Sequence, residues 1–315
     1  MKHIDAGLVE SLLSPAECVE IMADAMVAAS AGKVHIEPRL KEQFSGGDGE
    51  MLLMRAESAE LGSYAIKMIN ILPGNAARGL PVIQGVIQLF SCNTGNPIAS
   101  VDGGAVTALR TAAASALATR ELARADARSL GLLGTGVQAL SHFHCIRAVR
   151  DIESVCVWGR NPERAAVLGQ QLQELGPCEI RVVDTPAEAA ACDIVCTLTA
   201  SPEPIVERAW VQDGAHVNVV GSHSLQTREV DTALVAAAEV YVDLESSMLA
   251  EAGDIMIPVE EGAITLDHVV GEIGKVLAGD IPGRSRDSAI TLYKSLGVAA
   301  QDLYAAHRIA ELAES

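Results

Sequence analysis

Residues 129–139, Ser-Leu-Gly-Leu-Leu-Gly-Thr-Gly-Val-Gln-Ala, constrain the fold of this chain more than any other segment. They predict a short buried strand, a tight glycine turn and a helix over 137–149. Gly134 permits the turn, Gly136 lets a phosphate approach the backbone, and the small Ala139 lets the helix lie close to the sheet. Phosphates are attracted by the free N–H groups and the positive dipole end of such a helix. The segment therefore predicts a dinucleotide site rather than an ordinary strand-to-helix turn.

Strand and helix patterns alternate from this point on. Apolar runs predict strands at 130–133, 154–158, 180–183, 194–198, 215–220 and 240–242, with helical segments between them. Strands joined by helical crossovers form a doubly wound parallel sheet. We therefore predict an α/β fold with a Rossmann domain over 119–289.

The rest of the chain predicts a second, discontinuous domain. Short apolar runs over 50–101, broken by glycine and proline, indicate strands, and the Ala-rich stretch 103–123 predicts one long helix. The last segment, 290–313, also reads as a helix that returns to the first domain. The predicted α+β domain comprises 1–118 together with 290–315.

Composition excludes several classes of partner. With 41 acidic and 23 basic residues among 315, the formal net charge of −18 repels nucleic acid and anionic lipid. No apolar run reaches the roughly 18 residues that a membrane span needs, and no signal peptide is recognised. The seven cysteines form no C-x-x-C pair, which favours free thiols in a reducing cytoplasm. No cluster has zinc-ligand spacing, so we expect no metal.

The end of the second Rossmann strand bears on the choice of nucleotide. NAD enzymes usually place an acid there to bind the ribose 2′-hydroxyl, whereas this strand ends in Trp-Gly-Arg-Asn over 158–161. Arg160 and Asn161 can bind a 2′-phosphate, and Gly159 carries no side chain to repel it. NADP(H) is therefore preferred and NAD(H) remains possible, unless Arg160 is only a solvated surface residue. The other expected cofactor residues are Gly134, Thr135, Gly136, Val137, Gln138, Thr199, Val220 and Gly221.

Further motifs span nearly the whole chain. They are Lys-Met-Ile-Asn-Ile-Leu-Pro-Gly-Asn at 67–75, the threonine–arginine segment 101–115, Glu-Ala-Gly-Asp at 251–254, and 290–302, which ends in Gln-Asp. Together with the glycine turn, the chain resembles the ornithine cyclodeaminase/mu-crystallin family. That resemblance implies a homodimer with a Rossmann domain and a domain for substrate binding and dimerisation. It also implies activity on small 2-amino or 2-imino acids.

The resemblance implies that Arg39, Lys67 and Arg110 bind the substrate carboxylate, and that Lys67 takes part in proton transfer. The residues support this, since Lys67 lies in an apolar run at 64–69, where burial would lower its pKa. The alternative is an alternating strand in which Lys67 lies on the solvent-exposed face. Arg110 lies among alanines and needs an anionic partner, either a substrate carboxylate or an acid of the chain itself.

Two departures from the family pattern narrow the activity. His223 stands where cyclodeaminases of the family carry an Asp, and Leu52 aligns with their Glu. A cationic diamino acid thus loses two anionic partners, which argues against ornithine or lysine cyclisation. His223 is either a proton donor or a loop residue without a role. Glu251 and Ser295 match family positions near the substrate.

The predicted activity is NAD(P)H-dependent reduction of a 2-imino acid, reversible as an amino-acid dehydrogenase. The substrate is a cyclic ketimine such as pyrroline-2-carboxylate or an open imine, and its side chain stays open. The alternatives are a cyclodeaminase and a non-catalytic, NADPH-regulated binding protein. The presence of Lys67 and Arg110 favours an enzyme over the latter.

Overall fold

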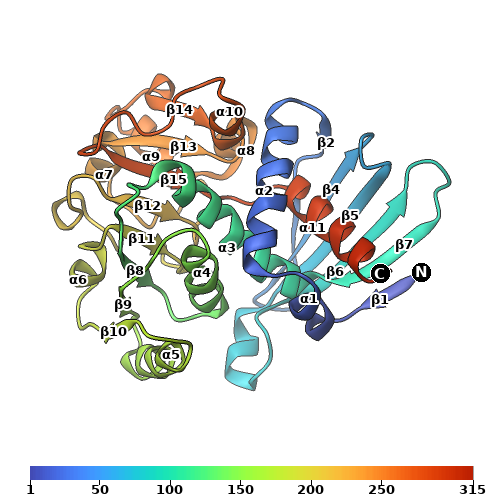
Figure 1. Cartoon of the computed structure of the whole chain (residues 1–315), viewed down its shortest axis with the longest axis horizontal. Helices are drawn as coiled ribbons and strands as arrows, with labels where there is room; N and C mark the ends of the chain where they lie inside the picture. Colours follow the sequence, from blue (N-terminus) through green and yellow to red (C-terminus); the bar gives the residue numbers. More distant parts are fainter. Residues whose placement is uncertain (315) are drawn as a thin grey trace. The chain divides into compact units, whose positions relative to one another are not determined.

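The computed structural model describes residues 1–314, which form two compact units (Figure 1). Unit 1 comprises Met1–Arg110 and the C-terminal segment that begins at Gly297. Unit 2 comprises Thr111–Leu296. The helix α3 (Gly103–Leu122) contains the boundary, and it agrees with the helix predicted over 103–123.

Unit 1 is built on a mostly antiparallel sheet with the strand order β1-β7-β6-β5-β4-β2, in which β3 also pairs with β4. Only β1 runs parallel to its neighbour, β7. The strands are β1 (Lys2–Ile4), β2 (Val34–Ile36), β3 (Leu40–Gln43), β4 (Glu50–Ser58), β5 (Ser63–Ile71), β6 (Ile83–Ser91) and β7 (Pro97–Asp102). The helices are α1 (Ala6–Leu12), α2 (Pro15–Ser30), the 3-10 turn η1 (Pro73–Arg78) and α11 (Ala299–Leu312).

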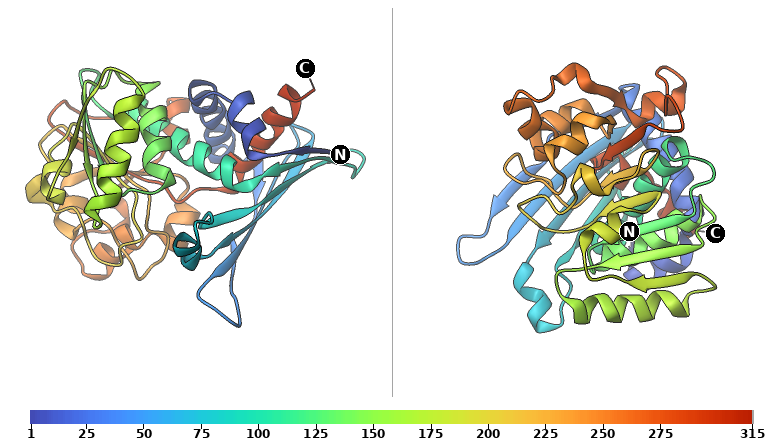
Figure 2. Two further views of the ribbon diagram at one scale, coloured as in Figure 1. Left: turned by 90° about the horizontal axis from the view of Figure 1, so that it is seen from below. Right: turned by 90° about the vertical axis from the view of Figure 1, so that its left-hand side faces the viewer.

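Helices α2 and α11 pack together against one face of this sheet, as Figure 2 shows. The start of α2 is fixed locally, because the Ser14 hydroxyl accepts a hydrogen bond from the Glu17 N–H and Pro15 occupies the first turn. Alternate residues of β5 point towards the helices, so that Ala65, Lys67 and Ile69 are buried. The strand therefore delivers a lysine into the interior of the unit.

Unit 2 contains an entirely parallel sheet with the strand order β10-β9-β8-β11-β12-β15-β13-β14. The strands are β8 (Ser129–Leu133), β9 (Ser154–Trp158), β10 (Glu179–Val182), β11 (Ile194–Thr197), β12 (His216–Val219), β13 (Ala238–Val242), β14 (Val269–Glu272) and β15 (Ile290–Lys294). The crossovers contain α4 (Val137–Arg147), α5 (Pro162–Glu174), α6 (Pro186–Ala190), η2 (Arg208–Trp210), α7 (Thr232–Ala237), α8 (Glu245–Glu251), α9 (Gly253–Glu260), η3 (Leu266–His268) and α10 (Ile273–Ala278). This is the doubly wound α/β fold that the sequence predicts.

The predicted helix over 290–313 is wrong in its first part. Residues 290–294 form β15, which lies between β12 and β13 with Leu292 paired to both Val217 and Val240. A strand that is buried on both faces has no polar alternation, so its apolar run does not distinguish strand from helix. The helix α11 begins only at Ala299.

This strand also corrects the predicted domain boundaries. Residues 290–296 belong to unit 2 rather than to the discontinuous domain, and the first segment of unit 1 ends at Arg110 rather than at 118. The sequence could not place that second boundary, because it falls inside the unbroken helix α3.

The core of unit 2 is mainly aliphatic, as the low aromatic content requires. Six of the seven cysteines are buried free thiols, and Cys92 is an exposed one. Within the described chain, no helix has both the length and the hydropathy to cross a lipid bilayer.

Candidate functional site

The glycine turn after β8 has the geometry of a phosphate cradle. Gly134 has a φ of +134°, and a Cβ there would lie 2.7 Å from the Leu198 carbonyl oxygen. A Cβ on Gly136 would instead point into open space, and this residue begins α4 without any side-chain cap. Ala139 is fully buried, so the helix lies close to the sheet. The helix start is therefore open to a bound anion, and these residues fit a dinucleotide pyrophosphate.

The neighbouring predicted residues surround this opening with different degrees of exposure. Val137 is 70% exposed at the first turn of α4, while Thr135 and Gln138 are half-buried. Thr199 and Val220 follow β11 and β12, and Gly221 comes next in the chain. All these positions lie at the carboxyl ends of parallel strands, where doubly wound folds bind their ligands.

Gly159, which follows β9, has a structural role that differs from the predicted one of leaving room for a 2′-phosphate. A Cβ on Gly159 would lie only 2.5 Å from Thr135 Cγ2, so the glycine allows the strand end to pack against the glycine turn. The Asn161 side-chain oxygen accepts a hydrogen bond from the Arg164 N–H at 2.9 Å and thereby caps α5. Arg160 is exposed and makes no hydrogen bond or ion pair within residues 1–314. Of the three residues, Arg160 is the one that remains available to an anion.

In unit 1, Lys67 lies in a buried ion pair. Its side chain is 1% exposed, and Nζ donates to Asp302 Oδ1 at 2.8 Å. Asp302 lies in the first turn of α11, where the helix dipole favours a negative charge. The predicted burial of Lys67 is confirmed, and the alternative of a lysine on the wet face of the strand is wrong.

Arg110 converges on the same carboxylate. Its Nε donates to Asp302 Oδ1 at 3.1 Å, and its Nη1 donates to Gln301 Oε1 at 3.0 Å. Of the two partners left open by the sequence, the structure contains the acid of the chain itself. Gly297, with a φ of +79°, makes room for this arrangement, because a Cβ there would collide with the Arg110 guanidinium.

Arg39 reaches the same region by a backbone contact. Its Nη2 donates to the Gly297 carbonyl at 2.6 Å. Arg39, Lys67 and Arg110 are thus gathered around the start of α11, as expected of residues that act together. Lys67 and Arg110 share the single carboxylate of Asp302, so these two cations carry one positive charge more than it when both are ionised, which suits an anionic substrate.

The electrostatics of this cluster favour proton exchange near neutral pH. Burial, with smaller contributions from the Arg110 and Arg39 charges, lowers the pKa of Lys67 from 10.5 to about 7 against the opposing effect of Asp302. Burial alone would raise the pKa of Asp302, but the Lys67 and Arg110 charges hold it below its usual value. Asp302 Oδ2 accepts no hydrogen bond from residues 1–314. The cluster therefore pairs a permanent carboxylate with a titratable lysine.

Asp302 and Gly297 are site residues that sequence reasoning missed. Both lie in or beside the motif at 290–302, which was used only for the family resemblance. A signal existed, because Asp302 occupies a buried position among Ala and Leu residues of α11. A buried acid in such a helix requires a cationic partner.

The remaining predicted site residues lie in unit 2. His223 follows β12 and is half-buried, with Nδ1 3.3 Å from the Gly221 carbonyl oxygen. Ser295 follows β15 and is buried, and its Oγ has no hydrogen-bond partner within the described residues. Glu251 ends α8 and is half-buried.

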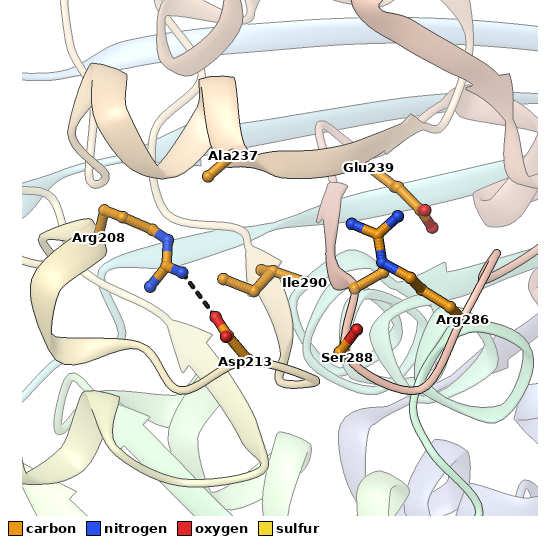
Figure 3. A pocket seen from close by; sticks show the side chains of 8 residues that line it. Arg208, Asp213, Ala237, Glu239, Arg286, Ser288 and Ile290 are labelled. Atoms are coloured by element: carbon orange, nitrogen blue, oxygen red, sulfur yellow. Dashed lines mark hydrogen bonds and ion pairs between the residues drawn. The ribbon is translucent and has the colours of Figure 1, made fainter.

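A cavity of about 190 Å³ also lies in unit 2, at the amino ends of the strands (Figure 3). Its lining includes Arg208, Glu239 and Arg286, and Arg208 Nη2 pairs with Asp213 Oδ1 at 2.7 Å. None of the predicted site residues lines it. Because doubly wound sheets bind cofactors at the opposite edge, we do not assign this cavity to the dinucleotide. Within residues 1–314, no group of three or more His, Cys, Asp or Glu side chains is placed to hold a metal ion.

The parallel sheet and its open glycine turn define a Rossmann-type dinucleotide-binding protein with an added cationic site. More particularly, this chain belongs to the ornithine cyclodeaminase/mu-crystallin family, whose model matches residues 4–315. The family predicted from the sequence motifs is confirmed.

The similar proteins include reductases and dehydrogenases. A Delta(1)-pyrroline-2-carboxylate reductase of Paracoccus denitrificans is 34% identical over 290 residues, which is 92% of either chain. The structure of a Thermococcus litoralis Delta(1)-pyrroline-2-carboxylate reductase with NADH and L-proline is 33% identical, with a TM-score of 0.96, and covers 100% of this chain and 98% of its own. An archaeal alanine dehydrogenase, a dimer with bound NAD, is 31% identical with a TM-score of 0.93 over 100% and 96%. The resemblance to the reductase branch is thereby confirmed.

Proposed function

We propose that this protein reduces a 2-imino acid to the 2-amino acid and catalyses the reverse reaction as an amino-acid dehydrogenase. It is an NAD(P)-dependent oxidoreductase that acts on a carbon–nitrogen bond. The observation that carries the proposal is the buried Lys67 beside Arg110 and Asp302, with a lysine pKa of about 7. The similarity to pyrroline-2-carboxylate reductases supports the same reaction class.

Each residue of the cluster has a chemical task in this reaction. Arg39 and Arg110 attract the substrate carboxylate, and Asp302 keeps the Lys67 ammonium in place. Lys67 donates a proton to the imine nitrogen, because a protonated imine accepts a hydride more readily than a neutral one. When bound at the glycine turn, a reduced nicotinamide cofactor would supply that hydride to the imine carbon. His223, Ser295 and Glu251 remain proposed substrate-side residues, and His223 is the second candidate for a proton donor.

The local environment of Lys67 argues against a cyclodeaminase. Leu52 is buried on β4 and pairs with Ile69 of β5, so it lies on the same inward face as Lys67. An aliphatic side chain at this position offers no charge to the second amine of ornithine or lysine. The decisive experiment measures NADPH and NADH oxidation with a panel of cyclic and open 2-imino acids, with ornithine as the control. Ammonia and proline formed from ornithine, without reduction of any imine, would contradict the proposal.

For the cofactor we propose binding at the glycine turn, with NADP(H) preferred and NAD(H) accepted. The support is Arg160, which is exposed after β9 where an acid would bind the NAD ribose. An Arg160→Ala substitution should weaken NADPH binding by roughly 1–3 kcal/mol and leave NADH binding nearly unchanged. Direct titration of both cofactors tests this, and a wild-type preference for NADH would reject it.

We also propose a homodimer that pairs through the outer face of the unit 1 sheet. The outward residues of β4, β5 and β6 include Leu53, Ile66 and Val86, and Met68 among them is 40% exposed. Leu53, Met68 and Val86 form one apolar row across these strands, and this row suits contact with a second copy of the chain. A cytoplasmic location fits the free thiols.

A further inference from the structure

Beneath the carboxyl ends of β11, β12 and β15 lies a cluster of three charged side chains, Glu229, Asp254 and Lys294. All three are completely buried. None belongs to the predicted substrate or cofactor residues. A buried charge cluster of this kind is costly, so its position in the fold needs an explanation.

Glu229 joins the ends of two strands through four hydrogen bonds. Its Oε1 accepts from the Thr199 N–H and hydroxyl, both at 2.7 Å. Its Oε2 accepts from the Gly221 N–H at 2.6 Å and from the Thr197 hydroxyl at 2.8 Å. A Cβ on Gly221 would collide with the Thr199 carbonyl oxygen, so the two loops touch at this point. The carboxylate therefore fixes the loops that contain Thr199 and Gly221.

Asp254 and Lys294 hold the backbone around Glu229 in place. Asp254 Oδ1 accepts from the Glu229 N–H at 2.6 Å and the Val230 N–H at 3.3 Å. Lys294 Nζ lies 2.8 Å from Asp254 Oδ2 and donates to the Ser222 carbonyl at 2.6 Å. The strand β15 thus contributes the only cation within the cluster.

The cluster carries a net charge of about −1 when all three groups are ionised. Burial raises the pKa of Glu229 above its usual value and the Asp254 charge adds to this rise, while Lys294 and the Thr199 donors oppose it. Each carboxylate oxygen of Glu229 accepts one backbone N–H, and such bonds favour the ionised form. The four donors around its two oxygens are therefore the geometric reason for assigning a negative charge to Glu229 at pH 8.

The topology indicates which part of a dinucleotide would meet this charge. A doubly wound sheet binds one mononucleotide half on each side of its central crossover. The glycine turn follows β8, whereas Thr199 and Gly221 follow β11 and β12 in the other half of the sheet (Figure 1). The charge cluster therefore underlies the half expected to receive the nicotinamide. This ring is cationic when oxidised and neutral when reduced.

We propose that Glu229, held by Asp254 and Lys294, both positions the Thr199 and Gly221 loops and favours the oxidised nicotinamide electrostatically over the reduced one. The inference rests on the proposed function. Glu229 would thus make the bound reduced cofactor a stronger hydride donor. It acts as a positioning residue, because the loops and not its carboxylate form the binding surface.

The test compares equilibrium binding of the oxidised and reduced cofactor to the wild type and to Glu229→Gln at pH 8. Calorimetry gives the dissociation constant of the oxidised form, and nicotinamide fluorescence gives that of the reduced form. We expect the substitution to weaken binding of the oxidised form about fivefold more than that of the reduced form, because one buried charge is lost. Glu207→Gln removes an exposed carboxylate of the same unit and should leave the ratio unchanged.

The outcomes separate this inference from the proposed function. If Glu229→Gln weakens both forms equally, the residue is only structural and the inference fails while the proposed function stands. If the wild type binds neither form, the proposed function itself fails. Circular dichroism checks folding, and Asp254→Asn provides the same charge test if Glu229→Gln does not fold.

Discussion

At the scale of single residues, the chemistry proposed for unit 1 depends on one carboxylate that two cations share. Asp302 Oδ1 contacts both Lys67 and Arg110, and the three groups are almost completely buried. Removing one member of such a cluster leaves the others unpaired, so the effects of substitutions will not be additive. Two substitutions distinguish the proposed proton donor, Lys67, from the carboxylate that sets its pKa, Asp302.

Lys67→Met should abolish most turnover and preserve cofactor binding. Methionine keeps the apolar stem but removes the proton, and Lys67 belongs to unit 1, whereas the glycine turn belongs to unit 2. We expect kcat to fall by about two to four orders of magnitude. Lys67→Arg should not rescue it, since a guanidinium scarcely deprotonates. A Lys67→Met variant with nearly normal kcat would transfer the proton donor role to His223.

Asp302→Asn should shift the pH dependence of reduction towards lower pH. The Asp302 charge raises the pKa of Lys67, so its removal lets that pKa fall below about 7 and protonated Lys67 is lost earlier as pH rises. The measurement is kcat for imine reduction from pH 5 to 9. Asp48→Asn, an exposed residue of the same unit, should leave the profile in place. If the profile of Asp302→Asn were not shifted, the fall of kcat with rising pH would not be due to deprotonation of Lys67.

At the scale of elements, buried histidines form hydrogen bonds between helices and between strands of unit 2. His142 of α4 donates from Nδ1 to the Gln138 carbonyl at 2.8 Å, and its Nε2 lies 2.9 Å from the Ser115 hydroxyl of α3. Burial lowers the pKa of His142 to about 4 and, together with Arg284, that of His216 to about 3. Both rings are therefore neutral in the folded protein at neutral pH.

These histidines should make the protein less stable as pH falls below about 6.5. The unfolded chain binds a proton on each ring near pH 6.5, whereas folded His142 resists protonation until about pH 4. The free energy of unfolding should fall over this window by about 3 kcal/mol for His142. Urea unfolding at several pH values measures it. His142→Gln should reduce the slope, and the exposed His3→Gln should not.

At the scale of the whole molecule, the proposed assembly and the proposed catalysis would use opposite faces of one sheet. The inward face of the unit 1 sheet carries Lys67, and the outward face carries the apolar residues assigned to the dimer. Because successive side chains of a strand point to opposite faces of the sheet, Lys67 and Met68 can have different roles. The chain needs both its units for the proposed reaction, because the glycine turn and Lys67 lie in different ones.

Met68→Glu should convert the proposed homodimer into a monomer. The side chain lies on β5 next to Lys67 in sequence but points to the other face, where it is 40% exposed. A charge at the centre of an apolar interface costs several kcal/mol of association when it is desolvated. Sedimentation at several concentrations measures the shift, with Val182→Glu in unit 2 as the control. An unchanged sedimentation coefficient would place the contact on another surface.

The family, the α/β fold and the dinucleotide turn could all be predicted from the amino-acid sequence. Each depends on local patterns: glycines with fixed spacing at 134 and 136, strands that alternate with helices, and motifs in a fixed order. The burial of Lys67 was also predictable, because an apolar run surrounds it. Its predicted roles, like those of His223 and Arg160, stay predictions.

Contacts between residues that are far apart in the chain could not be predicted and are known from the three-dimensional structure. Strand β15 could not be told from a helix, because burial on both faces removes the polar alternation that marks a strand. Asp302 lies 235 residues from Lys67, and Glu229 is separated from Thr199 by 30. A sequence shows that a buried charge needs a partner, but packing selects which one, because a partner need only be near in space.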